Sequence, residues 1–153
     1  MIDPKKIDIR NKRAGFDFEI LERYEAGMVL AGSEIKAIRN GGGSITEAFC
    51  YIRDNEVFIK GMNIPEYSHG AYANHEPVHI RKLLLNKREI AKLDKKLREK
   101  GLTLIPIRLF MSDRGFAKIE IGLGRGKKQF DKRNTLKQKE NQRELDRVMK
   151  KYR

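Results

Sequence analysis

The sequence lacks tryptophan and has a single cysteine, Cys50, among its 153 residues. One cysteine cannot form an internal disulfide or a multi-cysteine zinc site, and this scarcity is typical of a reducing compartment. Long hydrophobic runs are also missing, because the apolar stretch from 102 to 107 has only the length of a strand. We therefore expect no membrane-spanning helix and no export signal, and we predict a cytoplasmic location.

Acidic residues are too few to balance the basic ones. The chain has 34 Lys and Arg against 21 Asp and Glu, which gives a formal net charge of +13. Such a charge on a chain of one-domain length creates self-repulsion that a polyanion would relieve. Because no apolar anchor accompanies it, the charge predicts a nucleic-acid partner and no membrane.

Residue groupings typical of active sites are missing as well. His69, His75 and His79 lie close in sequence, but their spacing is irregular and no cysteine accompanies them, so we expect surface or RNA-contacting histidines and no metal. The glycine-rich segment 122–126 lacks the Lys-Ser/Thr of a phosphate-binding loop. We predict a small buried role for Cys50, no catalytic residues and no cofactor.

Three segments of different composition are predicted along the chain. Residues 1–13 are polar and without periodicity, which predicts a flexible basic leader. Residues 14–123 contain the folded domain. Residues 124–153 hold 12 basic and 4 acidic residues, and we expect this basic C-terminal tail to be disordered when free. Leu145, Val148, Met149 and Tyr152 lie at helical spacing, so its ordered form is expected to be an amphipathic helix.

About six strands and two helices are predicted in the domain. The strands are expected at 16–20 and 28–31 as a first hairpin, at 49–53 and 57–62 as a second, and at 102–110 and 116–123. Ser33 is expected to begin one short helix, and Asn86 with Glu89 to form the capping box of another. Residues 63–81 are expected to form a long loop. The pattern predicts a mainly β fold, a small antiparallel barrel with two to three flanking helices.

Residues 81–100 carry nine basic and three acidic side chains. The segment begins with Arg81 and Lys82 and continues through Lys87 and Arg88 into the predicted helix. Lysine and arginine bind phosphates and release counterions, so we expect a phosphate-binding face here, with an ordinary solvated helix face as the alternative. Candidates for stacking on bases are aromatic, namely Phe16, Tyr24, Tyr67 and Tyr72, although Phe16 also suits the core.

Five blocks of sequence, in order, resemble one protein family. The blocks are Asn11-Lys12-Arg13-Ala14, Tyr24-Glu25-Ala26-Gly27, Gly32-Ser33-Glu34-Ile35-Lys36, Arg81-Lys82-Leu83-Leu84-Leu85-Asn86 and Gly126-Lys127-Lys128-Gln129-Phe130-Asp131-Lys132-Arg133. They resemble the SmpB family, the SsrA-binding proteins that bind transfer-messenger RNA in bacterial trans-translation. The resemblance runs from about Asn11 to the C-terminus and implies an OB-like β-barrel with helices packed on it.

The resemblance also implies RNA-binding residues in the barrel. Glu25, Leu84 and Asn86 match the family's RNA-binding positions, and Lys36 lies in a matching block. We expect them to act with Arg81, Lys82, Lys87 and Arg88 of the basic segment. Glu25 can accept hydrogen bonds from base amines or hold a basic neighbour in place. Asn86 has two expected roles, as a helix cap and as an RNA contact.

For the tail, the resemblance implies a role on the ribosome. Family members bind the tRNA-like domain of transfer-messenger RNA and deliver it, with elongation factor Tu, to stalled 70S ribosomes, where the tail enters the empty messenger channel. The matching tail positions are Gly126, Lys127, Lys128, Phe130, Asp131, Lys132, Arg133, Val148 and Met149. The family usually has Tyr or His at position 130, so Phe130 can still stack on a base but cannot donate a hydrogen bond from its ring.

Two other functions remain open from the residues alone. A ribosomal protein or general RNA chaperone with the same barrel would have the same composition. A nuclease would need His69, His75 or His79 to act with Glu66 or Glu76, and no spacing in the sequence supports such a pair.

Overall fold

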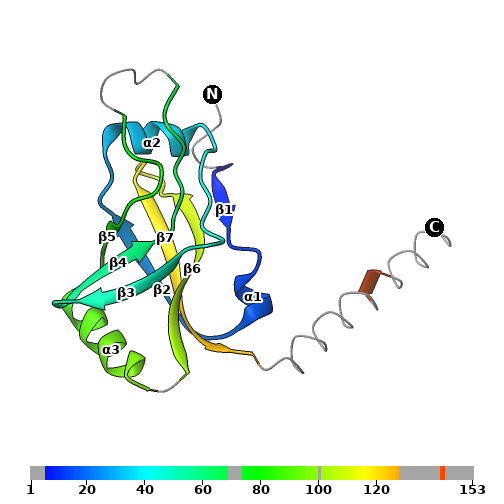
Figure 1. Ribbon diagram of the computed structural model, residues 1–153, viewed down its shortest axis with the longest axis vertical. Coiled ribbons are helices and arrows are strands. Elements are labelled where there is room, and N and C mark those ends of the chain that lie inside the picture. Colours follow the sequence, from blue (N-terminus) through cyan, green and yellow to red (C-terminus); the bar gives the residue numbers. More distant parts are fainter. Residues whose placement is uncertain (1–5, 69–73, 100, 128–141, 144–153) are drawn as a thin grey trace.

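Seven antiparallel strands and three helices make up the part of the chain that the structure, a computed structural model, describes: residues 6–68, 74–99, 101–127 and 142–143 (Figure 1). The strands are β1 (Asp8–Arg10), β2 (Phe18–Met28), β3 (Phe49–Arg53), β4 (Glu56–Lys60), β5 (Arg81–Leu84), β6 (Leu102–Met111) and β7 (Ala117–Gly126). The helices are α1 (Ala14–Asp17), α2 (Gly32–Arg39) and α3 (Lys87–Leu97).

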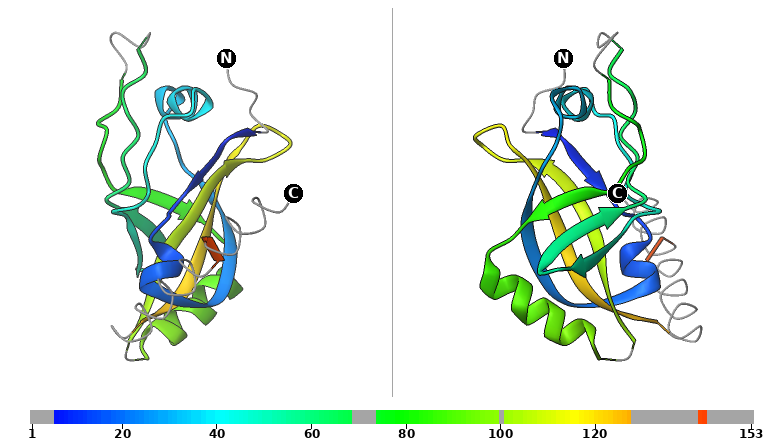
Figure 2. Two further views of the ribbon diagram at one scale, coloured as in Figure 1. Left: turned by 90° about the vertical axis from the view of Figure 1, so that its right-hand side faces the viewer. Right: turned by 60° about the vertical axis from the view of Figure 1, so that its left-hand side comes forward.

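Six of the strands close into a barrel. The sheet order is β1-β6-β3-β4-β5-β2-β7, and an additional pairing of β6 with β7 closes the ring from β2 to β7 (Figure 2). β6 is long enough to pair with β3 at Leu104 and with β1 at residues 108–110 along the same edge. The predicted mainly β fold, an antiparallel barrel of six strands with flanking helices, is confirmed.

The core lies inside the ring and follows the alternation of the strands. Ile119, Ile121 and Leu123 of β7 are buried, whereas Lys118 and Glu120, which alternate with them, are only half-buried. Successive side chains of a strand point to opposite faces, so one face of β7 packs inward and the other faces out. Removing the inward side chains from water is the main stabilising contribution to such a barrel.

The helices lie around the barrel, with α2 near one end and α3 near the other (Figures 1 and 2). α3 begins as predicted, because the Asn86 side chain accepts a hydrogen bond from the Glu89 amide at 2.9 Å and the Glu89 carboxylate accepts one from the Asn86 amide at 3.4 Å. Ile90 and Leu93 of its apolar stripe are buried. Among the described residues, no helix is long and apolar enough to cross a membrane.

The predicted hairpin between β3 and β4 is confirmed. Arg53 pairs with Glu56, so only Asp54 and Asn55 form the loop. Both have positive φ, 51° and 62°. Two consecutive positive φ values are the mark of a type I′ turn, which matches the twist of the flanking strands and which Asn and Asp tolerate well.

The first predicted hairpin is wrong. Residues 18–28 form one long strand, β2, and Phe16 belongs to α1. Gly27 does not break the strand because it pairs with Leu84 of β5 and with Lys118 of β7. β5 was missed because four residues inside a basic segment give little periodicity, and it supplies the sixth strand of the ring in place of the one expected at 28–31.

Two boundaries also differ from the expectation. Within the predicted flexible leader, β1 pairs with β6 and Ile7 is buried, so the leader is folded from about residue 7. β7 continues to Gly126, which pairs with Phe18, so the barrel extends three residues beyond 123. Pairing with a neighbouring strand orders these polar ends, and neither end carries a periodic pattern of its own.

Glycine in β7 has a packing role. A side chain at Gly122 would place its Cβ 2.7 Å from the Ile107 side chain and 3.1 Å from that of Ile20. These distances are shorter than van der Waals contact, so any larger residue at this position would force the end of the Ile107 side chain to move. The segment 122–126 is therefore a packed strand, in line with its lack of a phosphate-loop signature.

Candidate nucleic-acid interface

Glu25 comes together on the outer face of the barrel with Leu84 and Asn86, from which it is distant in the sequence. Leu84 lies opposite Gly27, and a Cβ on Gly27 would be 3.4 Å from the Leu84 side chain, so both lie on the same face of the sheet. Glu25 lies two residues before Gly27 on β2 and so faces the same side of the sheet, and Asn86 lies two residues after Leu84, just beyond the end of β5. All three side chains are exposed, and Leu84 retains 50% of its accessible surface.

This face continues across β7 and β6 to β1 in two rows of paired residues. One row contains Leu84, Gly27, Lys118, Phe110 and Asp8, and the next contains Glu25, Glu120, Arg108 and Arg10. The two rows present charged groups, an aromatic ring and an aliphatic side chain side by side. This mixture suits both phosphates and bases.

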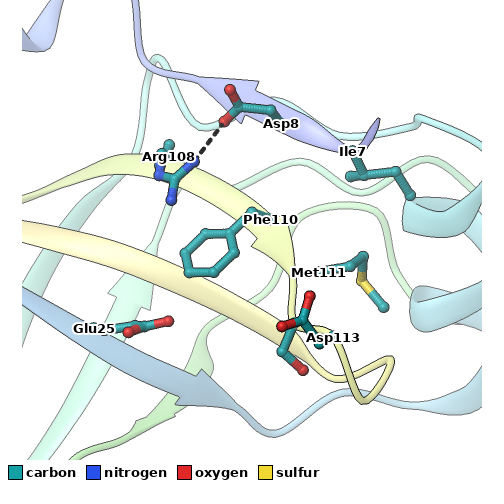
Figure 3. Close-up of a pocket in the computed structure, with 8 residues that line it drawn as sticks. Ile7, Asp8, Glu25, Arg108, Phe110, Met111 and Asp113 are labelled. Atoms are coloured by element: carbon teal, nitrogen blue, oxygen red, sulfur yellow. Dashed lines mark hydrogen bonds and ion pairs between the residues drawn. The ribbon is translucent and has the colours of Figure 1, made fainter. Parts of the chain in front are cut away.

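Ion pairs order most of the charges on this face. Glu120 accepts from Arg23 at 2.8 Å and from Arg108 at 3.3 Å, and Arg108 also reaches Asp8 at 3.4 Å (Figure 3). Glu25 lies opposite Glu120 but forms no hydrogen bond or ion pair with another described residue. Its two oxygens are therefore free to accept hydrogen bonds from a ligand.

The N-terminal end of α3 lies next to these residues, because α3 follows β5 directly. Four exposed basic residues of α3 have no ion pair within the described part of the chain: Lys87, Arg88, Lys92 and Lys95. Lys96 instead bridges Glu22, and Arg98 approaches Asp94 at 3.5 Å. The predicted phosphate-binding face is thus reduced to four unpaired cations, and Lys100 lies outside the described residues.

Arg81 is not part of an RNA-binding surface, contrary to the expectation. Its side chain is fully buried and forms an ion pair with Glu34. Its guanidinium also donates to the carbonyl oxygens of Met62 at 2.8 Å, Pro77 at 3.0 Å and His79 at 3.3 Å. With its donors used inside the protein, Arg81 joins β5 and the preceding loop to α2 and cannot reach a phosphate.

The other two predicted cations lie apart from α3. Lys82 is partly exposed and forms an ion pair with Glu56 at 2.8 Å. Lys36 is exposed on α2, where its Nζ lies 5.6 Å from the centre of the Tyr67 ring. Because α2 is near the opposite end of the barrel from α3, the structure does not bring Lys36 together with Asn86 and Lys87 (Figure 1).

The described histidines bind the loop 63–81 to α2. His75 lies 2.8 Å from the Ser33 hydroxyl and 2.8 Å from the Ile64 carbonyl oxygen, while His79 lies 3.2 Å from Glu34. α2 begins at Gly32 with Ala31 as its N-cap, so Ser33 lies inside the helix and is not the cap that the sequence predicted. His69 lies outside the described residues.

The described residues contain neither a metal site nor a reactive thiol. No cluster of three His, Cys, Asp or Glu side chains in the described ranges is arranged to hold a metal ion. Cys50 is buried, as expected, and burial raises the pKa of its thiol well above the ordinary value. A thiol that stays protonated is a poor nucleophile.

The aromatic residues expected to stack on bases are mostly used elsewhere. Tyr24 packs against the core, and its hydroxyl donates to Glu22; burial and this hydrogen bond raise the pKa of Tyr24 to about 12. Phe16 is half-buried in α1, and Tyr72 lies outside the described residues. Phe110 of β6 instead presents its ring on the outer face, in the row of paired residues that contains Leu84 and Gly27.

Of the tail positions matched to the family, the described residues include only Gly126 and Lys127. Gly126 ends β7, and the Lys127 amide and side chain donate to the carbonyl oxygens of Asp17 and Gly15, each at 2.9 Å. The base of the tail is thus attached to α1. The other predicted tail positions lie outside the described residues: Lys128, Phe130, Asp131, Lys132, Arg133, Val148 and Met149.

Comparison with known proteins identifies the family. The family model of the SmpB protein matches residues 8–151. The SsrA-binding protein of Christiangramia forsetii is 51% identical over 146 residues, 95% of this chain and 93% of the relative. The SsrA-binding protein of Cytophaga hutchinsonii is 53% identical over 144 residues, 94% of both chains.

A solved structure agrees with the sequence comparison. One chain of the solved structure "tmRNA-SmpB: a journey to the center of the bacterial ribosome" superimposes on this protein with a TM-score of 0.68 and 44% sequence identity. The match covers 80% of this chain and 86% of that one. A family model that spans most of the sequence, relatives identical at half of their positions and a shared barrel lead to one conclusion: this chain belongs to the SmpB family.

Proposed function

We propose that this protein binds the tRNA-like domain of transfer-messenger RNA through the outer face of β2 and β5 and the start of α3, and that it delivers this RNA to stalled ribosomes for trans-translation. The relatives are named for SsrA, another name of this RNA, and the structural neighbour is an SmpB with transfer-messenger RNA and the bacterial ribosome.

One observation carries the assignment of the surface. The fold brings Glu25, Leu84 and Asn86 to one exposed face, beside the four unpaired cations of α3. The carboxylate accepts hydrogen bonds, the amide both donates and accepts, and the leucine offers an apolar contact, so together they can read bases while the cations hold phosphates. The binding needs no catalytic group.

The tail completes the proposal. Its base is attached to α1 by Lys127 and thus starts from a fixed point on the barrel. From there, the positions from Gly126 onward act in the messenger channel. A bound messenger would block the tail from this channel, and an empty channel admits it. Elongation factor Tu takes part in the delivery complex, and the protein acts in the cytoplasm.

Affinity for RNA tests the binding surface. We expect tight binding to the tRNA-like fragment of transfer-messenger RNA, and weaker, more salt-sensitive binding to ordinary tRNA and duplex RNA. Replacing Lys87 or Arg88 by Gln should lower the slope of log affinity against log salt by about 0.7 to 0.9 per lost phosphate contact. Lys60→Gln, an exposed change at the far end of β4, is the control and should leave the slope unchanged.

Equal binding to all three RNAs would show only a general RNA-binding barrel and would favour the function of a ribosomal protein or RNA chaperone.

The tail is tested separately by ending the chain after residue 130. Peptide tagging on stalled ribosomes should be abolished while affinity for the RNA fragment stays near normal. Loss of that affinity would contradict the proposed division between barrel and tail.

A further inference from the structure

A pocket of about 410 Å³ opens on the outer face of the barrel, beside the proposed RNA surface (Figure 3). Glu25 of β2 and Phe110 of β6 line it, together with Asp8, Arg108 and Asp113. Phe110 lies outside the core cluster, which on this part of β6 is formed by its buried neighbours Leu109 and Met111. The pocket therefore presents an aromatic ring and a carboxylate to a ligand.

The Phe110 ring is oriented and supported so that a base can stack on it. It follows buried Leu109 and so points outward, and it is only half-buried. The Arg108 guanidinium lies 4.3 Å from the centre of the ring, a cation–π contact. Ion pairs with Asp8 and Glu120 fix that guanidinium in turn. A ring held in this way loses little freedom when a base stacks on it, which is how proteins commonly hold unstacked RNA bases.

Glu25 determines which hydrogen-bonding groups a base in this pocket must present on its edge. Its carboxylate has no partner among the described residues and can only accept hydrogen bonds. Guanine alone among the four bases presents two neighbouring donors, N1–H and the N2 amine, on its Watson–Crick edge; adenine and cytosine place an acceptor beside their amine. Asp8 and Asp113 add negative charge that disfavours a phosphate inside the pocket, so the base enters and its phosphate stays outside.

We infer that this pocket binds an unstacked guanine of the RNA, with the base stacked on Phe110 and its N1–H and N2 amine donating to the Glu25 carboxylate. The inference rests on the proposed function and deepens it, because it names the base that the surface selects and adds Phe110 to the binding residues. Arg108 is a positioning residue that orients the ring.

A tryptophan at position 110 reports stacking directly. The chain has no tryptophan, so the fluorescence of Phe110→Trp comes from the pocket alone. Binding of the tRNA-like fragment of transfer-messenger RNA should quench this fluorescence. The same fragment with its unpaired guanosines replaced by inosine, which lacks the N2 amine, should quench it much less at equal saturation. Unchanged fluorescence on saturation with the guanosine fragment would overturn the inference.

Affinity measurements identify the acceptor. Inosine substitution should weaken binding to the unmodified protein about tenfold, equivalent to about 1.4 kcal/mol. Glu25→Ala should bind the two fragments equally. The control Glu19→Ala removes an exposed carboxylate from the same strand and should keep the tenfold preference. An equal effect of inosine on the unmodified protein and on Glu25→Ala would refute the guanine pocket.

The experiments distinguish failure of the guanine pocket from failure of the proposed function. If the guanosine fragment binds tightly but inosine changes nothing, the proposed function stands and the guanine pocket is wrong. If the unmodified protein does not bind the fragment at all, the proposed function fails and the inference fails with it.

Discussion

The Arg81 guanidinium on β5 and the Glu34 carboxylate on α2 form an ion pair buried from solvent, with side-chain exposures of 0% and 3%. Glu34 also accepts a hydrogen bond from the Ala31 amide at 3.1 Å and faces His79 at 3.2 Å. The pair therefore joins the start of α2, the loop before β5 and the barrel. A residue that looks like a phosphate ligand in the sequence is a structural link in the fold.

Removing one partner of this pair should be costly. Arg81→Met should lower the free energy of unfolding by about 3 to 5 kcal/mol, because it leaves the Glu34 charge buried without the guanidinium that pairs with it. Urea denaturation followed by circular dichroism measures the change. Lys87→Met, at an exposed site on α3, should change the stability by less than about 0.5 kcal/mol. A change as small for Arg81→Met as for the control would show that the pair is not buried in solution.

The same carboxylate should make stability depend on pH. Burial by itself would raise the pKa of Glu34, but the hydrogen bond from Ala31 and the ion pair with Arg81 outweigh it and hold that pKa below the ordinary value of 4.5. The stabilisation is thus complete above pH 4.5 and is lost as the pH falls through the lower pKa of the folded protein. Denaturation curves of the unmodified protein and of Glu34→Gln should converge in this acidic range. A constant difference throughout would contradict the low pKa.

Asn86 has two roles that different substitutions can separate. Asn86→Ala removes the cap of α3 and should cost about 1 kcal/mol of stability as well as RNA affinity. Asn86→Asp keeps an oxygen for the Glu89 amide but loses the donating amide group, so it should retain stability and still weaken RNA binding. Thermal melts and RNA titrations of both variants give the comparison. Full RNA affinity in Asn86→Asp would leave only the capping role.

Cys50 should be unreactive in the folded protein. Its thiol is buried, and burial raises its pKa, so almost no thiolate is available to a disulfide reagent. We expect negligible labelling of the native protein at neutral pH and labelling of one thiol per chain in high urea. Rapid labelling without denaturant would show that the barrel opens at β3 far more often than its packing suggests.

Local features were predictable from the sequence because short-range contacts decide them. The capping box of Asn86 and Glu89 and the two-residue turn at Asp54 and Asn55 each depend on residues within four positions of one another. The alternation of β7 likewise records which side faces the core. The failures lie where partners are distant in the sequence: Gly27 did not end β2 because β5 and β7 pair with it on either side.

The candidate site shows the same division. The family blocks named Glu25, Leu84 and Asn86 as residues, but their meeting on one face depends on the pairing of β2 with β5. The outward direction of Phe110 was implicit in the alternation of its strand, yet its use depends on Arg108 and on Glu25 two strands away.

The sequence by itself determined the net charge, which is a simple sum over residues. It also determined the caps, the turns and the alternating strands of a β-barrel, since each follows from neighbouring residues. Tertiary structure alone decided which cations are available to RNA. Arg81 and Lys87 are both basic residues of one short segment, but Arg81 is buried against Glu34 and Lys87 is exposed. Burial and pairing arise only when distant strands and helices pack together, and they, rather than charge, decide which side chains can bind a ligand.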